Sequence, residues 1–292
     1  MIRQMQIAIV ATGKMGEAVA AGLVRAGVPA QQIVASNRRQ ARLDELAARH
    51  GVRVTLDNAE AARGAQVVVV CCKPQTFDAI AADIKDAIDA GALVVSVMAG
   101  VSTNRLRWSL GHERVVRAMP NLPGTIGAGI SVWYATPATL GEQHAVAAQV
   151  LASLGDEVQV NEENYLDMAT ALSGTGPAYL FMLMEALIDA GVHMGFSRHM
   201  SQKLVERTLA GSVEYAIRTQ DHPVTLRNAV TSPGGTTAAA LYEMERGRIR
   251  TVLADAVHAA WRRSVELGLA HRPGESEPKA ARGTARVDKR DD

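Results

Sequence analysis

Eight short apolar runs alternate with helix-like segments over the first 160 residues, and this alternation restricts the fold more than any other feature of the chain. Most of these runs are apolar at successive positions, so both faces of each strand need cover, as in a parallel sheet flanked by helices. We assign strands to residues 7–10, 33–35, 53–55, 67–72, 93–98, 114–118, 130–134 and 157–160. We assign helices to residues 16–26, 40–50, 77–90 and 140–154. The pattern predicts an α/β domain of the Rossmann type.

The chain changes character after Val160, where strand signals stop and long segments rich in Ala, Leu and Met begin. We therefore predict an α/β domain over residues 1–161, an all-helical domain over 162–270 and a disordered tail over 271–292. The helix expected from Ala178 to Met194 carries apolar residues around most of its circumference. One helical domain of this size cannot cover such a helix. We therefore expect two subunits to pack through this half of the chain.

Charge and aromatic content bear on the possible partners. The 292-residue chain has a formal net charge of +1 and 4% aromatic residues, which argues against a nucleic-acid surface. Residues 1–5 lack a signal-peptide profile, and we identify no apolar stretch of membrane-spanning length. We expect a cytoplasmic protein with no membrane partner.

The cysteines and histidines do not indicate a metal site. Cys71 and Cys72 are adjacent, and neighbours on a strand point to opposite faces, so we expect two reduced thiols and no disulfide between them. The eight histidines show no paired ligand spacing. We expect no bound metal.

The turn after the first strand resembles a dinucleotide fingerprint. It reads Ala11-Thr12-Gly13-Lys14-Met15-Gly16 and has glycine at two of the three fingerprint positions. Gly13 would let a pyrophosphate approach the backbone, and Gly16 would allow the helix to pack closely on the strand. Ala11 stands at the first position, where we expect a negative φ that tolerates its Cβ. An ordinary strand-to-helix turn is the alternative interpretation of these residues.

Two arginines follow the second strand, in the segment Ala35-Ser36-Asn37-Arg38-Arg39. NAD-selective proteins tend to have an acidic residue here, whereas guanidinium groups suit the 2′-phosphate of NADP. The sequence therefore favours NADPH, with NADH as the second choice. A solvated helix start is the alternative for Arg39, and a surface position is the alternative for Lys14.

A hydroxyl- and glycine-rich turn opens a helix late in the chain, in Val230-Thr231-Ser232-Pro233-Gly234-Gly235-Thr236-Thr237. Free N–H groups and the positive end of a helix dipole suit a carboxylate ligand. An ordinary helix start capped by Ser or Thr is the alternative interpretation.

Several segments together resemble the pyrroline-5-carboxylate reductase family, over residues 6–269. The most specific is the late turn just described, with the Ala-rich helix that follows it. The supporting segments are Lys73-Pro74, Ala99-Gly100, Arg117-Ala118-Met119-Pro120-Asn121 with Pro123, and Ser173-Gly174-Thr175-Gly176-Pro177-Ala178-Tyr179. The chain departs from the family pattern at Ala11, usually glycine, at Leu122, frequently threonine, and at Thr175, usually serine.

The resemblance implies a Rossmann-type domain, a helical domain that interlocks two subunits, and often a ring of such dimers, that is, a decamer. It implies NAD(P)H as the hydride donor and reduction of 1-pyrroline-5-carboxylate to L-proline. The implied cofactor contacts are Ala11, Thr12, Gly13, Lys14, Met15, Ser36, Asn37, Arg38, Arg39, Asn58, Cys71, Cys72, Lys73, Pro74, Met98, Ala99 and Gly100.

The late turn is the expected substrate site. Its backbone would hold the substrate carboxylate, through Ser232, Gly234, Gly235, Thr236 and Thr237. We expect the Thr237 hydroxyl to be the catalytic group that orients the ring nitrogen.

Two other functions fit parts of the sequence. A hydroxyacid dehydrogenase of similar plan would need a catalytic lysine, for which Lys203 is the candidate. A non-catalytic nucleotide sensor would bind NADPH without turnover.

Overall fold

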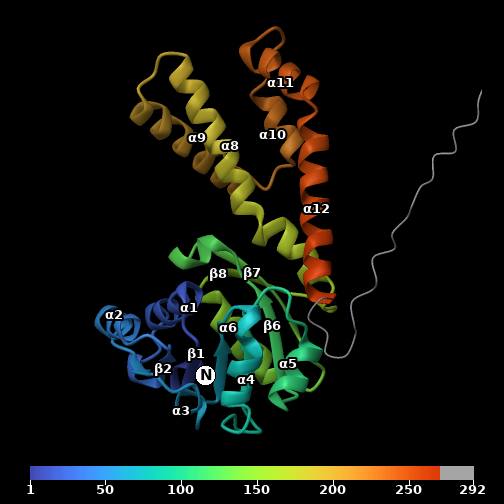
Figure 1. Ribbon diagram of the computed structural model, residues 1–292. Coiled ribbons are helices and arrows are strands. Elements are labelled where there is room, and N and C mark those ends of the chain that lie inside the picture. Colours follow the sequence, from blue (N-terminus) through green and yellow to red (C-terminus); the bar gives the residue numbers. More distant parts are fainter. Residues whose placement is uncertain (270–292) are drawn as a thin grey trace, which may run out of the picture.

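The structure is a computed structural model that describes residues 1–269, so the tail predicted over 271–292 lies outside the described residues. An α/β domain forms the lower part of the molecule, and long helices rise from it (Figure 1). This arrangement confirms the predicted fold class of a Rossmann-type domain followed by an all-helical region.

One eight-stranded sheet organises the α/β domain. Its strands are β1 (Ile7–Val10), β2 (Ile33–Ser36), β3 (Arg53–Thr55), β4 (Val67–Val70), β5 (Leu93–Ser96), β6 (Val115–Met119), β7 (Gly129–Ala135) and β8 (Gly155–Gln159). They lie in the order β3-β2-β1-β4-β5-β6-β7-β8. The first six strands are parallel, as predicted, but β7 runs antiparallel to β6, and β8 is parallel to β7. The direction of these last two strands is therefore a correction, since their apolar runs do not encode it.

Helices cover both faces of the sheet. In the α/β domain they are α1 (Lys14–Arg25), α2 (Gln40–His50), α3 (Asn58–Ala62), α4 (Phe77–Ile84), α5 (Thr103–Leu110) and α6 (Gly141–Ala152). Short 3₁₀ segments lie at Ile2–Gln4, Ala30–Gln32, Pro74–Thr76 and Leu122–Ile126. The helix predicted over 77–90 ends earlier, at Ile84, and neither the five-residue α3 nor α5 was predicted.

Alternate residues of the buried strands enter two separate apolar layers. Ile7 and Ile9 of β1 pack with α1, α2 and α6, whereas Ala8 and Val10 pack with α3, α4 and α5. All four residues of β1 are fully buried. This double burial explains why the central strands are apolar throughout and why their carboxyl ends are free to carry a site.

The helical region begins after β8. It comprises α7 (Tyr165–Ala169), a π-helical segment, η5 (Thr170–Gly174), α8 (Gly176–His193), α9 (Arg198–Thr219), α10 (Pro223–Ala229), α11 (Thr236–Arg246) and α12 (Ile249–Leu269). Helices α8 and α9 pack against each other, and α12 packs against η5 and α7. The exact domain limits at residues 161 and 270 remain predictions.

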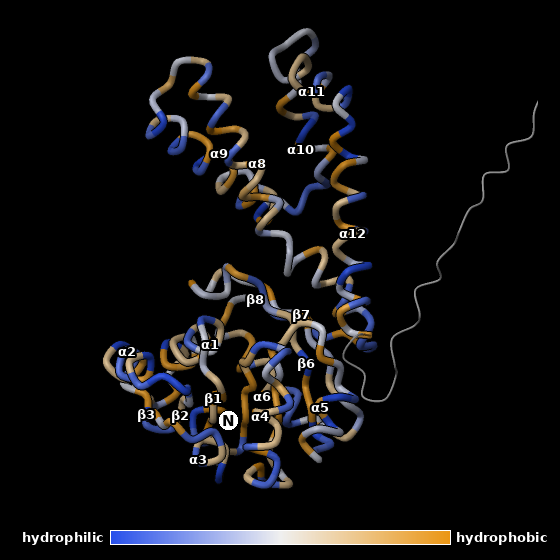
Figure 2. Tube along the Cα trace, in the orientation of Figure 1, coloured by the Kyte–Doolittle hydropathy of each residue, from blue (hydrophilic) through white to orange (hydrophobic). Residues whose placement is uncertain are grey.

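Helix α8 leaves most of its apolar side chains uncovered within one chain. Leu180, Phe181 and Met182 are 55%, 52% and 76% exposed, and hydrophobic segments along α8 lie outside the α/β domain (Figure 2). The continuous helix Tyr165–His193 is long and apolar enough to cross a membrane by length and composition. The expectation that no stretch reaches such a length is therefore wrong. An exposed face of this kind also suits a subunit interface.

Candidate active site

Four loops that follow parallel strands meet at the carboxyl edge of the sheet. These are the loops after β1, β2, β4 and β5, which carry most of the residues expected to bind the cofactor. The Cys71 N–H donates to the Val10 carbonyl at 3.1 Å, and the Val97 N–H donates to the Val70 carbonyl at 3.2 Å. The structure thus brings the predicted nucleotide loops together, at the position where open α/β sheets bind ligands.

Ala11 adopts a left-handed backbone conformation with φ of 56°. The expectation of a negative φ at this position is therefore wrong, and the turn itself requires what glycine gives most easily. The Ala11 N–H donates to Ser36 Oγ at 3.1 Å, and the Thr12 N–H donates to the Ser36 carbonyl at 2.7 Å. These two bonds to β2 hold the strained turn in place, which explains how alanine is accommodated.

The two glycines of the turn have different surroundings. A Cβ on Gly16 would lie 3.0 Å from Thr12 Cγ2 and 3.1 Å from Ile9 Cγ2, so only glycine lets α1 pack this closely on β1. A Cβ on Gly13 would meet nothing within 4 Å among the described residues. Gly13 is the N-cap of α1 and makes no side-chain cap. The backbone amides at this helix start are therefore open to an anion, which fits the diphosphate of a dinucleotide.

A hydrogen-bond chain fixes the far side of the nucleotide loops. Ser36 Oγ donates to Asn58 Oδ1 at 2.7 Å, and Asn58 Nδ2 donates to Asp83 Oδ2 at 3.1 Å. Asn37 Nδ2 donates to the Thr12 carbonyl at 2.8 Å. Ser36 is fully buried. Ser36 and Asn58 thus shape the site from within the protein, and Asp83 is a member that the sequence did not indicate.

Arg38 and Arg39 are exposed beside the start of α2. Neither side chain has an ion-pair partner within residues 1–269, and the first turn of α2 contains no acidic residue. Cations near a helix start are disfavoured by the helix dipole, typically by about 0.3–1 kcal/mol each. The arrangement suits an added anion, such as a 2′-phosphate. Lys14 and Met15, at the start of α1, are exposed and half-buried respectively.

The loops after β4 and β5 touch each other through sulfur atoms. Cys72 Sγ donates to Met98 Sδ at 3.2 Å. Burial raises the pKa of the Cys71 thiol and raises the pKa of Cys72 to about 11, so both remain protonated near neutral pH. Both cysteines are free, as expected, and they lie in the loop after Val70 and not within the strand.

Lys73 and Pro74 continue this edge of the site. Lys73 is exposed and precedes the 3₁₀ turn that Pro74 begins, and Thr76 Oγ1 donates to the Lys73 carbonyl at 3.0 Å. On the neighbouring loop Ala99 is exposed, whereas Gly100 is buried with φ of 70°.

The late turn has the geometry of an anion cradle. Gly235 is the N-cap of α11 and provides no side-chain cap, and its N–H closes a turn onto the Ser232 carbonyl at 3.1 Å. Gly234 has φ of 71°, a conformation that glycine adopts without strain. The first amides of α11, at Thr236 and Thr237, are thus left for a ligand. We call residues 232–237 the cradle.

Within one chain the cradle lies far from the nucleotide loops. Helix α12 follows α11 directly, and its 21 residues correspond to a length of about 31 Å. Its last turn lies against Gly100 of the cofactor loop, while its first turn joins the cradle helix. Figure 1 shows α11 at the end of the helical region remote from the sheet. The structure therefore brings together the predicted cofactor residues, but it does not bring Thr237 to them within the same subunit.

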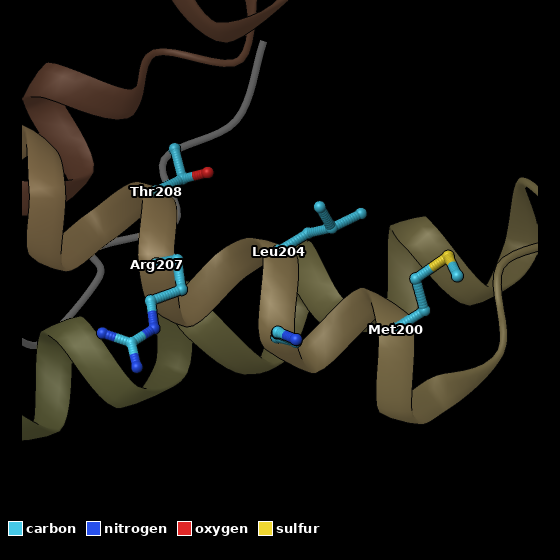
Figure 3. Close-up of a pocket in the computed structure, with 5 residues that line it drawn as sticks. Met200, Leu204, Arg207 and Thr208 are labelled. Carbon is cyan, nitrogen blue, oxygen red and sulfur yellow. The ribbon is translucent and has the colours of Figure 1, made fainter.

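A separate hollow of about 370 Å³ lies on the exposed face of α9. It is lined by Met200, Lys203, Leu204, Arg207 and Thr208, which form one stripe along the helix (Figure 3). This hollow lies in the helical region and away from the nucleotide loops. Lys203 is thus not beside the carboxyl edge of its own sheet.

Residues 1–269 contain no group of three or more His, Cys, Asp or Glu side chains that could hold a metal ion. They do contain a buried ion cluster that sequence reasoning missed. Arg117 lies 2.9 Å from Glu163 and 3.3 Å from Asp167, and its side chain is 7% exposed. An arginine inside an apolar strand was the available signal for this cluster.

Two family models match the chain. The model described as pyrroline-5-carboxylate reductase dimerisation matches residues 163–267. The model described as NADP oxidoreductase coenzyme F420-dependent matches residues 6–100. The second match covers the nucleotide loops, and the first covers the exposed apolar helices and the cradle.

Relatives and solved structures resemble nearly the whole chain. A pyrroline-5-carboxylate reductase of Synechocystis is 38% identical over 264 residues, which cover 90% of this chain and 98% of the relative. The structure of a pyrroline-5-carboxylate reductase from Coxiella burnetii has a TM-score of 0.85 at 34% identity and covers 90% of this chain and 98% of its own. A Plasmodium falciparum pyrroline carboxylate reductase structure with NADP bound has a TM-score of 0.82 at 29% identity, with coverages of 92% and 100%.

Proposed function

Since this chain belongs to the pyrroline-5-carboxylate reductase family, we propose that its cradle and its nucleotide loops form one active site across two subunits. The chain is an NAD(P)H-dependent oxidoreductase that reduces 1-pyrroline-5-carboxylate to L-proline. Its helical region is a dimerisation domain, which supports a homodimer.

The cradle binds the substrate carboxylate. The uncapped amides of Thr236 and Thr237 lie in the first turn of α11, where the helix dipole favours a negative charge. The glycine-rich turn lets the substrate approach the backbone, and the exposed Ser232 hydroxyl adds a further donor. No charged side chain is needed for this step.

Thr237 orients the reacting bond. Its hydroxyl lies one residue inside the helix, next to the carboxylate site, and donates a hydrogen bond to the ring nitrogen. Bound NADPH supplies the hydride to the imine carbon. Because a threonine hydroxyl is a weak acid, its contribution is orientation and stabilisation of the changing charge at nitrogen, while the proton comes from solvent or is already present on the iminium.

The preferred cofactor is NADPH, with NADH as a weaker substitute. The observation that supports this preference is the pair of exposed arginines, Arg38 and Arg39, which have no ion-pair partner in the described chain. They lie at the start of α2, whose first turn contains no acidic residue. A 2′-phosphate would supply the anion that this helix start lacks.

The length of α12 carries the proposal of a shared site. Hydride transfer requires contact between the two reactants, but α12 extends for about 31 Å from the cofactor loop of its own subunit, and α11, which begins at the cradle, lies at the far end of the helical region (Figure 1). A partner subunit bound through the apolar helices would present its cradle to the nucleotide loops instead. Each dimer would then hold two active sites, each built from both chains.

The activity assay measures NADPH oxidation with pyrroline-5-carboxylate beside piperideine-6-carboxylate and a panel of oxoacids. We expect turnover with the cyclic imino acids and none with the oxoacids. For Thr237→Ala we expect kcat/KM to fall roughly tenfold or more, the order for one oriented hydrogen bond. Turnover of an oxoacid in place of the imine, or unchanged kinetics in Thr237→Ala, would contradict these assignments.

Subunit mixing tests the shared site. Gly13→Val should fold, because a Cβ there meets nothing within 4 Å, but it should block the pyrophosphate. A mixed dimer of Gly13→Val with Thr237→Ala would contain one intact site and one doubly defective site. Random mixing should therefore restore about one quarter of the wild-type activity. Activity no higher than the mean of the two parent variants would show that each site lies within one chain.

We also propose that dimers assemble into a ring of five and that the protein is cytoplasmic. The first follows from the family resemblance, and light scattering of the full chain would test it by distinguishing a dimer from a decamer. Cell fractionation would test the second.

A further inference from the structure

One side chain of α12 is buried, whereas the other described residues of this helix are half-buried or exposed. Ser264 is 5% exposed and is the buried residue of α12 within the described chain. Its Oγ donates to Asp167 Oδ1 of α7 at 2.9 Å. The last two turns of α12 are thus attached to the base of the helical region through a hydroxyl.

The acceptor of this bond is itself held by the α/β domain. Arg117 of β6 lies 3.3 Å from Asp167 and 2.9 Å from Glu163, and Glu163 also accepts the Thr103 N–H at 2.8 Å. These donors come from β6, the sixth of the eight strands across the sheet, and from the first turn of α5. The Asp167 side chain is therefore held in place by the α/β domain, and its hydrogen bond with Ser264 positions the end of α12.

The turn of α12 beyond Ser264 lies on the predicted cofactor loop. A Cβ on Gly100 would stand 3.6 Å from Leu267 Cβ, 3.8 Å from the Leu267 carbonyl carbon and 3.9 Å from the Gly268 N. Because Gly100 itself has no Cβ, these distances place the last turn of α12 beside the backbone of the loop. Gly100 is buried and has φ of 70°, a conformation that glycine adopts without strain.

We propose that Ser264 is a positioning residue for hydride transfer, which acts by holding the end of α12 against residues 98–100. The proposal deepens the function above and rests on the assignment of that loop to the cofactor. Ser264 touches neither reactant. Without its hydroxyl, the end of α12 loses its polar attachment to Asp167, and the loop after β5 loses the surface that supports it. A misplacement of even about 1 Å between reactants is enough to slow transfer strongly.

The first test needs neither cofactor nor substrate. Hydrogen–deuterium exchange is measured on the full-length dimer for the peptide covering residues 97–104. In Ser264→Ala this peptide should exchange at least about threefold faster, while peptides from β1 and β4 remain unchanged. Thr251→Ala is the matched control, because Thr251 is an exposed hydroxyl residue on the same helix, and it should leave the exchange unaltered. Unchanged exchange in Ser264→Ala, or faster exchange throughout the domain, would overturn the proposal.

The second test separates positioning from stability. In Ser264→Ala we expect kcat to fall roughly tenfold. The Kd for NADPH should change less than about twofold, because the phosphate contacts lie on the other loops. The primary isotope effect, measured with NADPH deuterated at the transferred position, should rise as hydride transfer becomes limiting. A lower thermal midpoint with unchanged kcat and isotope effect would overturn the proposal. Failure of the wild type to reduce pyrroline-5-carboxylate would instead refute the proposed function. The hydrogen–deuterium exchange of residues 97–104 would then still show whether Ser264 holds this loop in place.

Discussion

The buried Arg117 cluster allows a stability prediction to be worked from the structure. The Arg117 side chain is 7% exposed, and its partners Glu163 and Asp167 are 24% and 20% exposed. Arg117→Ala would leave two carboxylates in this enclosed position without their shared cation. Breaking a buried pair costs about 3–5 kcal/mol, and partial exposure of the carboxylates places this case at about 3 kcal/mol. For a domain of roughly 150–250 residues, a loss of about 3 kcal/mol in unfolding free energy corresponds to a drop in Tm of about 6–12 °C.

The assay is thermal unfolding followed by circular dichroism, at one protein concentration, because dimerisation makes Tm concentration-dependent. Arg107→Ala is the matched control, since Arg107 pairs with Glu113 at the surface, where the side chains are 38% and 61% exposed, and it should cost less than about 1 kcal/mol. The triple variant Arg117→Met, Glu163→Gln, Asp167→Asn should recover most of the loss, because it removes the unpaired charges. If Arg117→Ala were no worse than Arg107→Ala, the claim that this cluster ties the domains together would be refuted.

Three further predictions follow from single side chains. Arg38→Asp should lower the ratio of kcat/KM for NADPH to that for NADH roughly tenfold or more, and an unchanged ratio would remove Arg38 from the phosphate site. Gly16→Ala should destabilise the protein by about 1–3 kcal/mol in urea unfolding, because its Cβ would lie 3.0 Å from Thr12 Cγ2, whereas Gly13→Ala should have little effect. Burial acts to raise the pKa of Glu17, but hydrogen bonds from His50 and Arg42 outweigh it and lower that pKa below its ordinary value of 4.5. Its stabilisation is therefore present above pH 4.5 and is lost as the pH falls through the lowered pKa, so Glu17→Gln should show a shallower loss of stability in acid than the wild type.

The central part of the fold could be predicted because burial on both faces leaves a clear mark in the sequence. Runs such as Val67–Val70 are apolar at every position, since alternate side chains enter different layers. The reversed direction of β7 could not be predicted, because its alternating pattern satisfies either orientation. The five-residue α3 is too short to show a helical period.

The sequence predicted the parts of the site that depend on local backbone conformation. It did not predict the parts that depend on contacts between residues far apart in the chain. Gly16, Gly234 and Gly235 are favoured by local geometry, and together with Gly13 their spacing alone indicates a turn before a helix. The positive φ of Ala11 was missed because an alanine gives no local sign of a left-handed conformation. Ser264 and Asp167 are 97 residues apart, and no local pattern connects them.

The two outermost strands of the sheet also limit how these chains associate. β3 is three residues long and begins with the exposed Arg53, while β8 carries the exposed Asp156 and the half-buried Glu157. Short strands bearing charge are poor templates for adding another strand. The charges on the edge strands therefore disfavour pairing of the sheet with a second copy, while the exposed apolar face of α8 remains available to the dimerisation region.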